Sequence, residues 1–478
     1  MKTNSLLKNF LRHASSMDTL AFSIFDGEKR ESISYRKFSN DVLCAANSLM
    51  KRHIRSQHIA LLAPNSYLWI VNFFSILASG NVPVPLNPDV SKGTILRHCE
   101  KADVSVICAD TSIISDLDVA DSTIKILSLN NRIDGMPMSL DEVYSAGPDE
   151  TILLMFTSGT TGSSKVVAYS ANNIRSLLID AGEQVCNLEM HSSLLCLPLY
   201  HAYGVLSVIT LLYQYKTICI GRGMRYLIAD MSVLNPATVN LVPSVLDSLV
   251  KLLKKAGTAE ERQRYIGHNL TSITIGGASA QPAVCYYMME LGIRVLSAYG
   301  MTESAGAGTS CILNEYNMGS IGKPYGKTQC RIENGELLLK SPAVMKGYYK
   351  DPEATAKIIV NGWLHTGDIA SCDERGFYYI IGRKKNVIIL SNGENVNPEE
   401  IEAKWAEFGP VLECLVYGDG RGICADVYTT DKPKAMRYIK AYNESVPTYH
   451  QVYKVNYFEK PLEKTASGKI KRKEFPNG

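Results

Sequence analysis

Residues 156–165 read Phe-Thr-Ser-Gly-Thr-Thr-Gly-Ser-Ser-Lys and follow directly after the apolar run 152–156. The apolar run is typical of a buried strand, and the polar run predicts a loop that leaves the end of that strand. Small residues let the backbone approach an anion closely, and successive backbone N–H groups can form a concave anion-binding nest. The hydroxyl groups add donors and Lys165 adds a positive charge, so this stretch predicts a loop that holds a polyphosphate.

The loop is not a P-loop, because the Gly-x4-Gly-Lys spacing is absent. The alternative is an ordinary flexible loop, since Ser/Thr/Gly-rich stretches often have no other role. The wording of the loop resembles the signature loop of the adenylate-forming superfamily, which comprises acyl- and aryl-CoA synthetases, luciferases and the adenylation domains of peptide synthetases. One departure is Ser164, where the family usually has proline. The resemblance implies that the ATP phosphates are held by Thr157, Ser158, Gly159, Thr160, Thr161, Gly162 and Lys165.

The whole chain has the composition of a globular enzyme with more than one domain. Its 478 residues exceed what one compact core usually supports, and 46% hydrophobic with 20% charged residues is ordinary for a soluble protein. The net charge of +3 is too small to indicate nucleic acid or an anionic membrane as the main partner. The N-terminus lacks the apolar core of a signal peptide, and the longest apolar run, 68–78, is too short to span a bilayer.

The twelve cysteines are scattered from Cys44 to Cys424, and none forms a Cys-x-x-Cys pair. This spacing argues against a zinc site, and without a secretory signal it argues against a disulfide framework. We therefore expect reduced thiols, no transmembrane segment and a cytoplasmic location.

Short apolar runs alternate with helical patterns through the first two thirds of the chain, which is typical of parallel α/β construction. The expected strands are 57–64, 104–109, 193–197, 217–220, 238–241 and 271–275, and the expected helices include 67–79 and 92–102. After residue 325, short β-like segments dominate, at 329–332, 336–340, 377–381 and 387–390. From Pro398 a helix begins, with glutamates near its positive end.

The predicted fold class is therefore α/β. We expect a large N-terminal domain of parallel-rich sheets with flanking helices plus a β-subdomain, and a small, mobile α+β C-terminal domain. The boundary is placed near Gly382–Lys385. Residues 1–382 are then the adenylation core that binds ATP and the acid, and residues 383–478 are the small domain that carries the catalytic lysine.

The motif at 197–204, Leu-Pro-Leu-Tyr-His-Ala-Tyr-Gly, follows a predicted strand. Read alone, it predicts either a packed aromatic loop or the wall of a pocket for an organic acid. The resemblance implies that His201 lies beside the acyl carboxylate and is catalytic. Members that activate amino acids have an acidic residue in this region, whereas Ala202 and Tyr203 are neutral here, so an α-amino acid is disfavoured. Hydroxybenzoate activators often carry Asn at the position of Ala202, which also disfavours that subclass.

The motif at 299–303, Tyr-Gly-Met-Thr-Glu, combines an aromatic face, a hydroxyl and a carboxylate within five residues. These groups suit a nucleotide: Tyr299 would stack on adenine, Thr302 would bind the phosphate, and Glu303 would ligate Mg²⁺ through oxygen. The resemblance gives the same roles, with Thr302 and Glu303 catalytic. The glycines at 276–277 let a flat ligand lie against the backbone, although a simple turn is the alternative. The further nucleotide-binding candidates are Gly277, Ala278, Gly300 and Met301.

Four more positions, in three segments, match motifs of the superfamily. Asp368 ends a Thr-Gly-Asp turn and would accept the ribose hydroxyls; the alternative is an aspartate that stabilises the turn. Arg383 matches the ribose- or phosphate-binding arginine, and Lys385 the hinge. Lys469, in Lys-Thr-Ala-Ser-Gly-Lys at 464–469, matches the catalytic lysine that reaches both the substrate carboxylate and the α-phosphate. Without the resemblance, both basic segments would be read as solvated surface.

The resemblance spans almost the whole chain and implies ATP-dependent activation of a carboxylic acid to an acyl-adenylate. Thioester formation with coenzyme A then follows, so ATP, Mg²⁺ and coenzyme A are the expected cofactors. A stand-alone ligase that loads the phosphopantetheine of a carrier protein in trans is the alternative, and a non-catalytic nucleotide-binding relative is the third reading. The acid-binding candidates are His201, Tyr203, Ser244, Gly276 and Ala298. They predict a neutral, partly aromatic pocket that fits medium-chain fatty, aryl and arylalkanoic acids.

Overall fold

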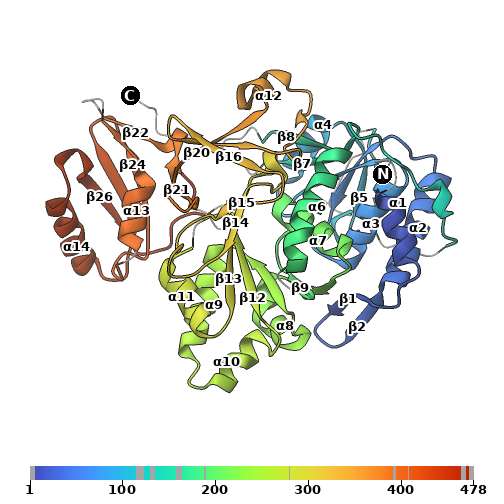
Figure 1. Cartoon of the computed structure of the whole chain (residues 1–478), viewed down its shortest axis with the longest axis horizontal. Coiled ribbons are helices and arrows are strands. Elements are labelled where there is room, and N and C mark those ends of the chain that lie inside the picture. The colour runs from blue at the N-terminus through green and yellow to red at the C-terminus, as the bar shows by residue number, and fades with distance from the viewer. Residues whose placement is uncertain are drawn as a thin grey trace.

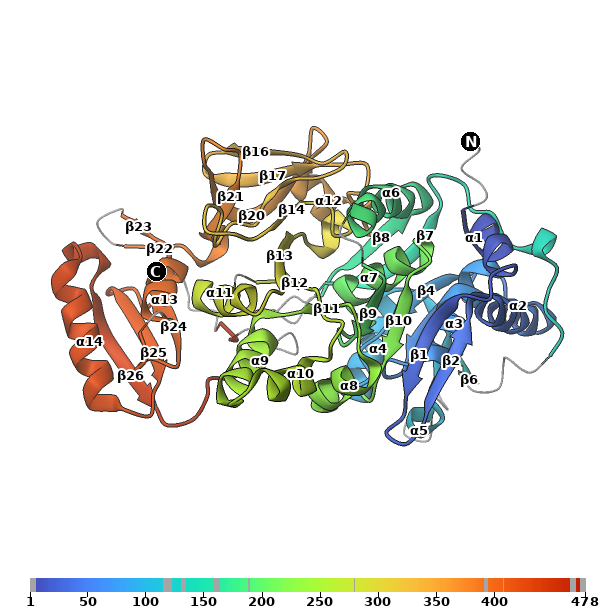
Figure 2. The same ribbon diagram turned by 60° about the horizontal axis from the view of Figure 1, so that its bottom comes forward.

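The computed structural model describes residues 6–114, 123–129, 135–157, 164–187, 190–278, 280–390, 394–406, 408–464 and 470–472. The N-terminal helices lie at one end of the molecule and the C-terminal elements at the other (Figures 1 and 2). Three units built on β-sheets precede the C-terminal part of the chain.

The largest sheet has nine strands in the order β15-β14-β13-β12-β11-β9-β10-β1-β2. Neighbouring strands from β13 to β1 run parallel, and antiparallel pairs (β1–β2, β13–β14, β14–β15) form both edges. The strands are β1 (Leu20–Phe25), β2 (Arg30–Ser34), β9 (Ser192–Leu195), β10 (Thr217–Ile220), β11 (Thr238–Leu241), β12 (Ser272–Gly276), β13 (Arg294–Tyr299), β14 (Thr309–Ile312) and β15 (Lys323–Pro324).

Helices pack on this sheet because its central strands are apolar on both faces. Leu241, Ile273 and Val295 are completely buried and form one core with Leu246 and Leu249 of α9. The helices of this part are α7 (Ala202–Tyr213), α8 (Leu227–Leu234), α9 (Pro243–Lys255), α10 (Ala259–Ile266) and α11 (Pro282–Glu290). Helix α9 begins with a proline at its first turn, where the missing N–H costs no hydrogen bond.

Two smaller sheets lie beside the largest one, and the predicted phosphate loop connects β7 to β8 of the three-stranded sheet. The four-stranded sheet β4-β3-β5-β6 is parallel throughout, and the three-stranded sheet β18-β8-β7 is antiparallel. A large core that includes Trp69, Phe73, Phe74 and Tyr169 joins them to the surrounding helices. The elements are α1 (Leu6–Ala14), α2 (Tyr35–Lys51), β3 (His58–Leu62), α3 (Tyr67–Ala78), β4 (Val82–Pro85), α4 (Lys92–Lys101), β5 (Val104–Ala109), α5 (Thr111–Ile114), β6 (Lys125–Ser128), β7 (Thr151–Phe156), β8 (Val166–Ser170), α6 (Ala171–Asn187) and β18 (Gly347–Tyr348).

A separate five-stranded β unit follows in the chain, in which β16, β17, β20 and β19 pair in that order and β21 joins β20. Its core is made by Leu337, Leu339, Leu364 and Ala370. The elements are β16 (Gln329–Glu333), β17 (Glu336–Lys340), α12 (Pro352–Ile358), β19 (Ile359–Val360), β20 (Trp363–Cys372) and β21 (Tyr378–Arg383). Figure 2 shows this unit above α11 and β13.

The last part of the chain has its own core around Trp405, Val416, Ala425 and Ile439. It contains a three-stranded sheet, β24-β25-β26, and a two-stranded one, β22-β23. The elements are β22 (Ile388–Ile389), β23 (Asn395–Val396), α13 (Pro398–Ala406), β24 (Glu413–Gly418), β25 (Ile423–Tyr428), α14 (Lys432–Ser445) and β26 (Val452–Phe458). The exact domain boundary at 382/383 and the mobility of the last domain stay predictions.

Each strand and helix expected from the sequence corresponds to an element within a few residues of its predicted ends. The cysteines that the structure describes are all free, as expected for reduced thiols. None of the helices in the described part of the chain has the length and apolarity needed to cross a bilayer.

Candidate functional site

The predicted phosphate loop leaves the end of β7, and its two ends are joined. The Thr157 backbone N–H donates to the Lys165 carbonyl at 3.0 Å, and the Lys165 N–H donates to Thr157 Oγ1 at 3.1 Å. These bonds close the neck of the loop between β7 and β8. The other predicted phosphate ligands lie outside the described residues: Ser158, Gly159, Thr160, Thr161 and Gly162.

Lys165 and Glu303 meet on opposite parts of one tyrosine, Tyr348 of β18. The Tyr348 hydroxyl donates to Oε1 of Glu303 at 2.8 Å, and the Lys165 ammonium lies 4.5 Å from the centre of the Tyr348 ring. Burial and the Glu303 carboxylate raise the pKa of Tyr348, so the hydroxyl stays protonated and is the donor. A positive charge and a carboxylate are therefore held at a fixed separation beside the loop.

The backbone of the Thr302–Glu303 turn is fixed from two sides. The Met345 N–H donates to the Glu303 carbonyl at 2.9 Å, and the Tyr169 hydroxyl donates to the Thr302 carbonyl. Among the described residues, Oε2 of Glu303 accepts no hydrogen bond. A single free carboxylate oxygen fits Mg²⁺, which is usually held by one or two carboxylates together with substrate phosphates. No cluster of three or more His, Cys, Asp or Glu side chains in the described part of the chain forms a metal cage of its own.

A second group of predicted residues lies where β13 meets the β unit. The Tyr299 hydroxyl donates to Oδ2 of Asp368 at 2.5 Å, and Nε of Arg383 lies 2.6 Å from Oδ1 of the same carboxylate. Arg383 also donates to the Thr366 carbonyl at 3.2 Å. Burial and the Asp368 carboxylate raise the pKa of Tyr299, which keeps it a donor. Three residues that the sequence assigned to adenosine are thus joined by direct contacts.

The glycine of the Tyr-Gly-Met-Thr-Glu motif is required by a close approach of two chain segments. A Cβ on Gly300 would lie 2.8 Å from the Gly306 carbonyl oxygen. This distance is too short for a side chain to fit without a shift of the backbone. Met301 packs against the core of the β unit, while Gly277 and Ala278 are exposed after the end of β12. Both of the latter lie at the carboxyl edge of the largest sheet, where α/β proteins usually bind ligands.

Two of the predicted acid-binding residues are in contact. The Tyr203 ring lies against Gly276, so that a Cβ added at Gly276 would be 2.8 Å from the ring. The Tyr203 hydroxyl lies 3.4 Å from the Thr274 carbonyl, and burial raises its pKa. Ala298 is the strand neighbour of Gly276 in the β12–β13 register. Ser244 lies in the first turn of α9, and no hydrogen bond among the described residues joins it to the other acid-binding candidates.

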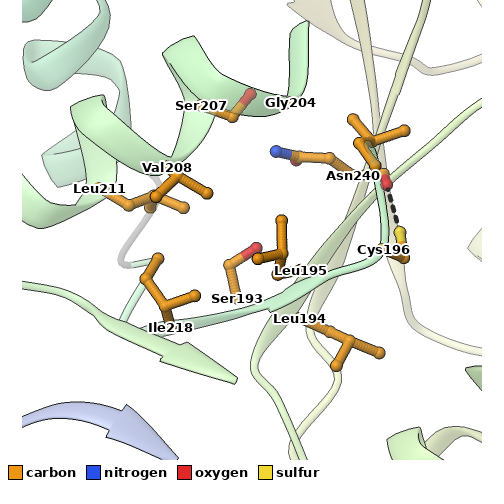
Figure 3. Close-up of a pocket in the computed structure, with 11 residues that line it drawn as sticks. Ser193, Leu194, Leu195, Cys196, Gly204, Ser207, Val208, Leu211, Ile218 and Asn240 are labelled. Atoms are coloured by element: carbon orange, nitrogen blue, oxygen red, sulfur yellow. Dashed lines mark hydrogen bonds between the residues drawn. The ribbon is translucent and has the colours of Figure 1, made fainter. Parts of the chain in front are cut away.

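His201 lies directly before α7, the helix that packs on strands β9 and β10 of the largest sheet. Figure 3 shows the space between them, where Ser207 and Val208 of α7 face Leu195 and Asn240 across a cavity of about 10 Å³. This volume holds about one water and cannot hold an acid. Nε2 of His201 is buried and has no hydrogen-bond partner in the described part of the chain, and burial lowers the pKa of the ring. A neutral imidazole with an unused polar atom suits a ligand oxygen.

Two predicted site residues remain: Lys385, the hinge candidate, and Lys469, the predicted catalytic lysine. Lys385 is exposed in a short 3-10 helix, Lys384–Asn386, directly after Arg383. Its neighbour Lys384 pairs with Oε2 of Glu336 at 3.0 Å. Lys469 lies outside the described residues, and the adjoining Ile470 bridges to Lys464, which pairs with Glu413 at 2.6 Å.

Tyr348 and Tyr169 are site residues that the sequence analysis missed. Tyr348 follows Gly347 in a short segment between Lys346 and Lys350 that matches none of the motifs, and Tyr169 lies inside an ordinary apolar strand. Tyr348 contacts Glu303, 45 positions away, and Tyr169 contacts Thr302, 133 positions away; no local pattern indicates these contacts.

Comparisons with known proteins identify the family of the chain. A family model described as AMP-binding enzyme matches residues 11–349, and one described as AMP-binding enzyme C-terminal domain matches residues 385–477. The 2-succinylbenzoate–CoA ligase of Bacillus cytotoxicus is 29% identical, over 94% of this chain and 94% of the relative. A protein of the same name from Bacillus cereus is 30% identical, over 82% of this chain and 81% of the relative.

Solved structures show the same fold. O-succinylbenzoate coenzyme A synthetase from Bacillus subtilis, in complex with ATP and a magnesium ion, has a TM-score of 0.85 at 22% identity and covers 98% of this chain and 99% of its own. ATP-bound MatB from Rhodopseudomonas palustris has a TM-score of 0.86 at 22% identity, with 98% and 97% covered. The predicted fold class is confirmed, and the chain belongs to the AMP-binding enzyme family of the adenylate-forming superfamily.

Proposed function

We propose that this protein is an AMP-forming acid–thiol ligase that activates a carboxylic acid with ATP and then transfers the acyl group to coenzyme A. The observation that carries the proposal is the pair of contacts on Tyr348, which hold Lys165 and Glu303 beside the phosphate loop. The relatives named above are ligases of this type by name, and the Bacillus cytotoxicus protein matches 94% of this chain. The Bacillus subtilis structure was solved with ATP and magnesium, which supports the same cofactors here.

The reaction has two steps. A carboxylate oxygen of the acid attacks the α-phosphorus of ATP, and the bond from that phosphorus to the bridging oxygen of pyrophosphate breaks. The acyl-adenylate then has AMP as its leaving group. A thiolate attacks the acyl carbon, the bond to the AMP oxygen breaks, and the thioester forms. In the first step the enzyme must hold two anions together and offset their charge.

The residues of the site divide this task. The ammonium of Lys165 and the loop that it closes hold the β- and γ-phosphates, while Thr302 binds phosphate. When bound, Mg²⁺ offsets the negative charge of the reacting phosphate oxygens. Glu303 would hold this ion through the oxygen that Tyr348 leaves free. Asp368, fixed between Tyr299 and Arg383, faces the ribose in this assignment.

Lys469 would reach both the substrate carboxylate and the α-phosphate, and it belongs to the part of the chain that we assign to a mobile domain. Rotation about Lys385 after adenylation would remove Lys469 and admit the thiol. Lid-type gating of this kind sequesters one half-reaction from the next. The Arg383–Asp368 and Lys384–Glu336 ion pairs directly precede Lys385 and attach the chain to the β unit up to the proposed rotation point.

We propose an aryl acid as the substrate, with 2-succinylbenzoate as the first candidate because the relatives at 29% and 30% identity are named for it. The unpartnered Nε2 of His201 would donate to the carboxylate of the acid. The Tyr203 ring against Gly276 forms an aromatic wall for a flat substrate. Medium-chain fatty and arylalkanoic acids are the alternatives on the same geometry.

The acceptor of the acyl group is coenzyme A in this proposal. Loading of a carrier protein's phosphopantetheine is the second candidate, since the reacting thiol is the same in both. The two acceptors differ in the surface that presents the thiol, and a direct assay separates them.

The test is acid-dependent release of pyrophosphate from ATP and Mg²⁺ across a panel of carboxylic acids, with and without coenzyme A. Release with 2-succinylbenzoate that coenzyme A accelerates, together with an acyl-CoA product by mass spectrometry, is the expected result. Release with another acid class would replace the proposed substrate. Release that coenzyme A does not accelerate would favour the carrier protein. If no acid gave release although ATP bound, the catalytic proposal would fail.

A further inference from the structure

One histidine outside the family motifs touches both ends of the phosphate loop. The His98 ring of α4 stacks on Phe156, with ring centres 4.2 Å apart and planes 25° from parallel. Its Nε2 lies 3.1 Å from Oγ of Ser164, at hydrogen-bond distance. Phe156 is the residue before Thr157, and Ser164 is the residue before Lys165. A single side chain therefore contacts the chain as it enters the loop and as it leaves it.

A second side chain of the same helix supports the same point. The Lys101 ammonium donates to the Ser164 carbonyl at 3.4 Å. The two hydrogen bonds between Thr157 and Lys165 join the ends of the loop to each other, and the contacts with His98 and Lys101 join them to α4. Helix α4 is thus attached to the loop through Ser164.

Ser164 is also the position at which this chain departs from its family. A proline there would fix φ of the backbone and so restrict the end of the loop. Serine does not fix φ in this way, so it leaves more conformations open to the backbone at position 164. Its hydroxyl, in return, gives His98 a hydrogen-bonding partner that proline would not have. The departure and the contact with α4 occur at the same residue.

We propose that His98 is a positioning residue for ATP, which fixes the neck of the phosphate loop through Ser164 in place of the rigid residue common in the family. The inference rests on the proposed function only in taking the loop as the triphosphate site. His98 itself touches neither substrate nor the reacting atoms. It acts by restricting Phe156 and Ser164, so that less conformational entropy is lost at the neck on binding.

The charge state of His98 agrees with this role. Burial, followed by the positive charges of Lys101 and Arg97, lowers the pKa of the imidazole. The ring is therefore neutral at pH 7 and leaves the positive charge near the loop to the lysines. A neutral ring also stacks on Phe156 without the cost of burying a charge.

The experiment compares three single variants by calorimetric titration with ATP and Mg²⁺ in the absence of acid, so that no turnover occurs. His98→Ala removes both contacts, and His98→Gln keeps an amide that reaches Ser164 Oγ. His58→Ala is the matched control, because His58 likewise packs on an aromatic ring and makes one hydrogen bond. Its ring centre lies 5.4 Å from that of Tyr349, and its Nδ1 lies 2.6 Å from the Ala102 carbonyl oxygen. It lies near α4 but does not touch the loop residues.

His98→Ala should raise the dissociation constant for ATP about three- to tenfold, the range expected for the loss of one hydrogen bond. His98→Gln should recover much of the affinity, and His58→Ala should leave it unchanged. In the turnover assay, the KM for ATP should rise while the KM for the acid stays constant. An unchanged dissociation constant in His98→Ala, or an equal rise in His58→Ala, would overturn the inference.

Ser164→Ala provides a milder variant that removes only the hydroxyl. It should weaken ATP binding in the same direction, and His98→Ala should add less than about twofold in that background because the shared bond is already gone. Fully additive effects would show that His98 acts independently of Ser164 and would contradict the inference. Wild-type protein that binds ATP but releases no pyrophosphate with any acid would count against the proposed function and leave the binding test of His98 valid.

Discussion

The Tyr348 hydroxyl donates a 2.8 Å hydrogen bond to Glu303, and the face of the same ring lies 4.5 Å from the Lys165 ammonium. Tyr348 therefore connects the two motifs that the sequence assigned to phosphate and to magnesium. The connection divides the side chain into two parts with different tasks: the hydroxyl orients the carboxylate, and the ring positions the ammonium. The hydroxyl can be removed while the ring is kept.

The first prediction concerns the hydroxyl. Tyr348→Phe keeps the ring beside Lys165 but frees Glu303 to rotate, so the Mg²⁺ concentration for half-maximal pyrophosphate release should rise. We expect kcat/KM for ATP to fall about tenfold, as for the loss of a hydrogen bond to a charged group. Tyr349→Phe is the control, because the neighbouring hydroxyl bonds to Asp103 at 2.6 Å, away from Glu303. An unchanged magnesium dependence in Tyr348→Phe would refute the orienting role.

The second prediction concerns the acid pocket. Gly276→Ala would bring a Cβ to 2.8 Å from the Tyr203 ring, so the ring or strand β12 must shift. We expect the KM for the acid to rise about tenfold or more, in line with the cost of overpacking a buried site. The KM for ATP should stay constant, because ATP is assigned to other residues. Steady-state kinetics with each substrate varied in turn measures both values.

The pocket prediction has an internal control. Tyr203→Phe removes the hydroxyl but not the ring and should leave the clash with Gly276→Ala in place. Tyr203→Ala in the Gly276→Ala background should restore space and lower the KM for a bulkier acid. If Gly276→Ala changed the KM for ATP as much as that for the acid, Gly276 would not belong to the acid pocket.

The third prediction separates the two half-reactions. Lys469→Ala should block adenylation, which needs its charge at the reacting phosphate, but spare thioester formation from a supplied acyl-adenylate. Single-turnover assays of each half-reaction measure this directly. Equal losses in both would show that Lys469 acts throughout the cycle and that the domain does not alternate.

The fourth prediction tests the hinge. Lys385→Pro restricts the backbone at the proposed rotation point, so it should slow thioester formation more than adenylation. Lys384→Ala is the control, because it removes the neighbouring ion pair with Glu336 without restricting the backbone. If Lys385→Pro slowed both half-reactions by the same factor, the hinge would lie elsewhere.

The sequence predicted the elements, and brought together the candidates for the site, because those signals are local. The strand before Thr157 and the loop after it are read from adjacent residues, and the same holds for Tyr299 and Glu303. The contacts of Tyr348 with Glu303, and of His98 with Ser164, were not predictable in this way. Each depends on the packing of two segments distant in sequence, and neither tyrosine nor histidine carries a local signal for such a partner.

Tertiary packing also decided features of the fold that periodicity left open. The antiparallel hairpin β1–β2 joins the nine-stranded sheet beside β10, although it lies almost two hundred residues before that strand in the chain. Similarly, Asp368 reaches Tyr299 only because β20 of the β unit passes the end of β13. The expected Thr-Gly-Asp turn was wrong, because Asp368 lies within strand β20. Its role toward the ribose stays a prediction.

The fifth prediction concerns pH and the C-terminal part of the chain. Glu402 of α13 accepts from the Val416 N–H at 2.7 Å and pairs with Arg472 at 2.6 Å. Burial raises the pKa of Glu402 to about 7, while Arg472 lowers it and Glu399 raises it. The folded state therefore holds this proton more tightly than the unfolded state. The contribution of Glu402 to stability is therefore fully present below the ordinary carboxyl pKa of about 4.5 and is lost as pH rises through about 7.

Arg472→Gln removes the charge that favours ionised Glu402, so the pKa of Glu402 should rise further and the charged form should be less tolerated. At pH 8 the variant must bury a carboxylate without its partner, whereas at pH 5 Glu402 is already protonated. We expect the loss in free energy of unfolding to be about 2 kcal/mol larger at pH 8 than at pH 5. Urea denaturation at both pH values measures it, with the exposed Arg437→Gln of α14 as the charge-matched control. Equal losses at both pH values would mean that Glu402 keeps an ordinary pKa and that Arg472 contributes through its hydrogen bonds alone.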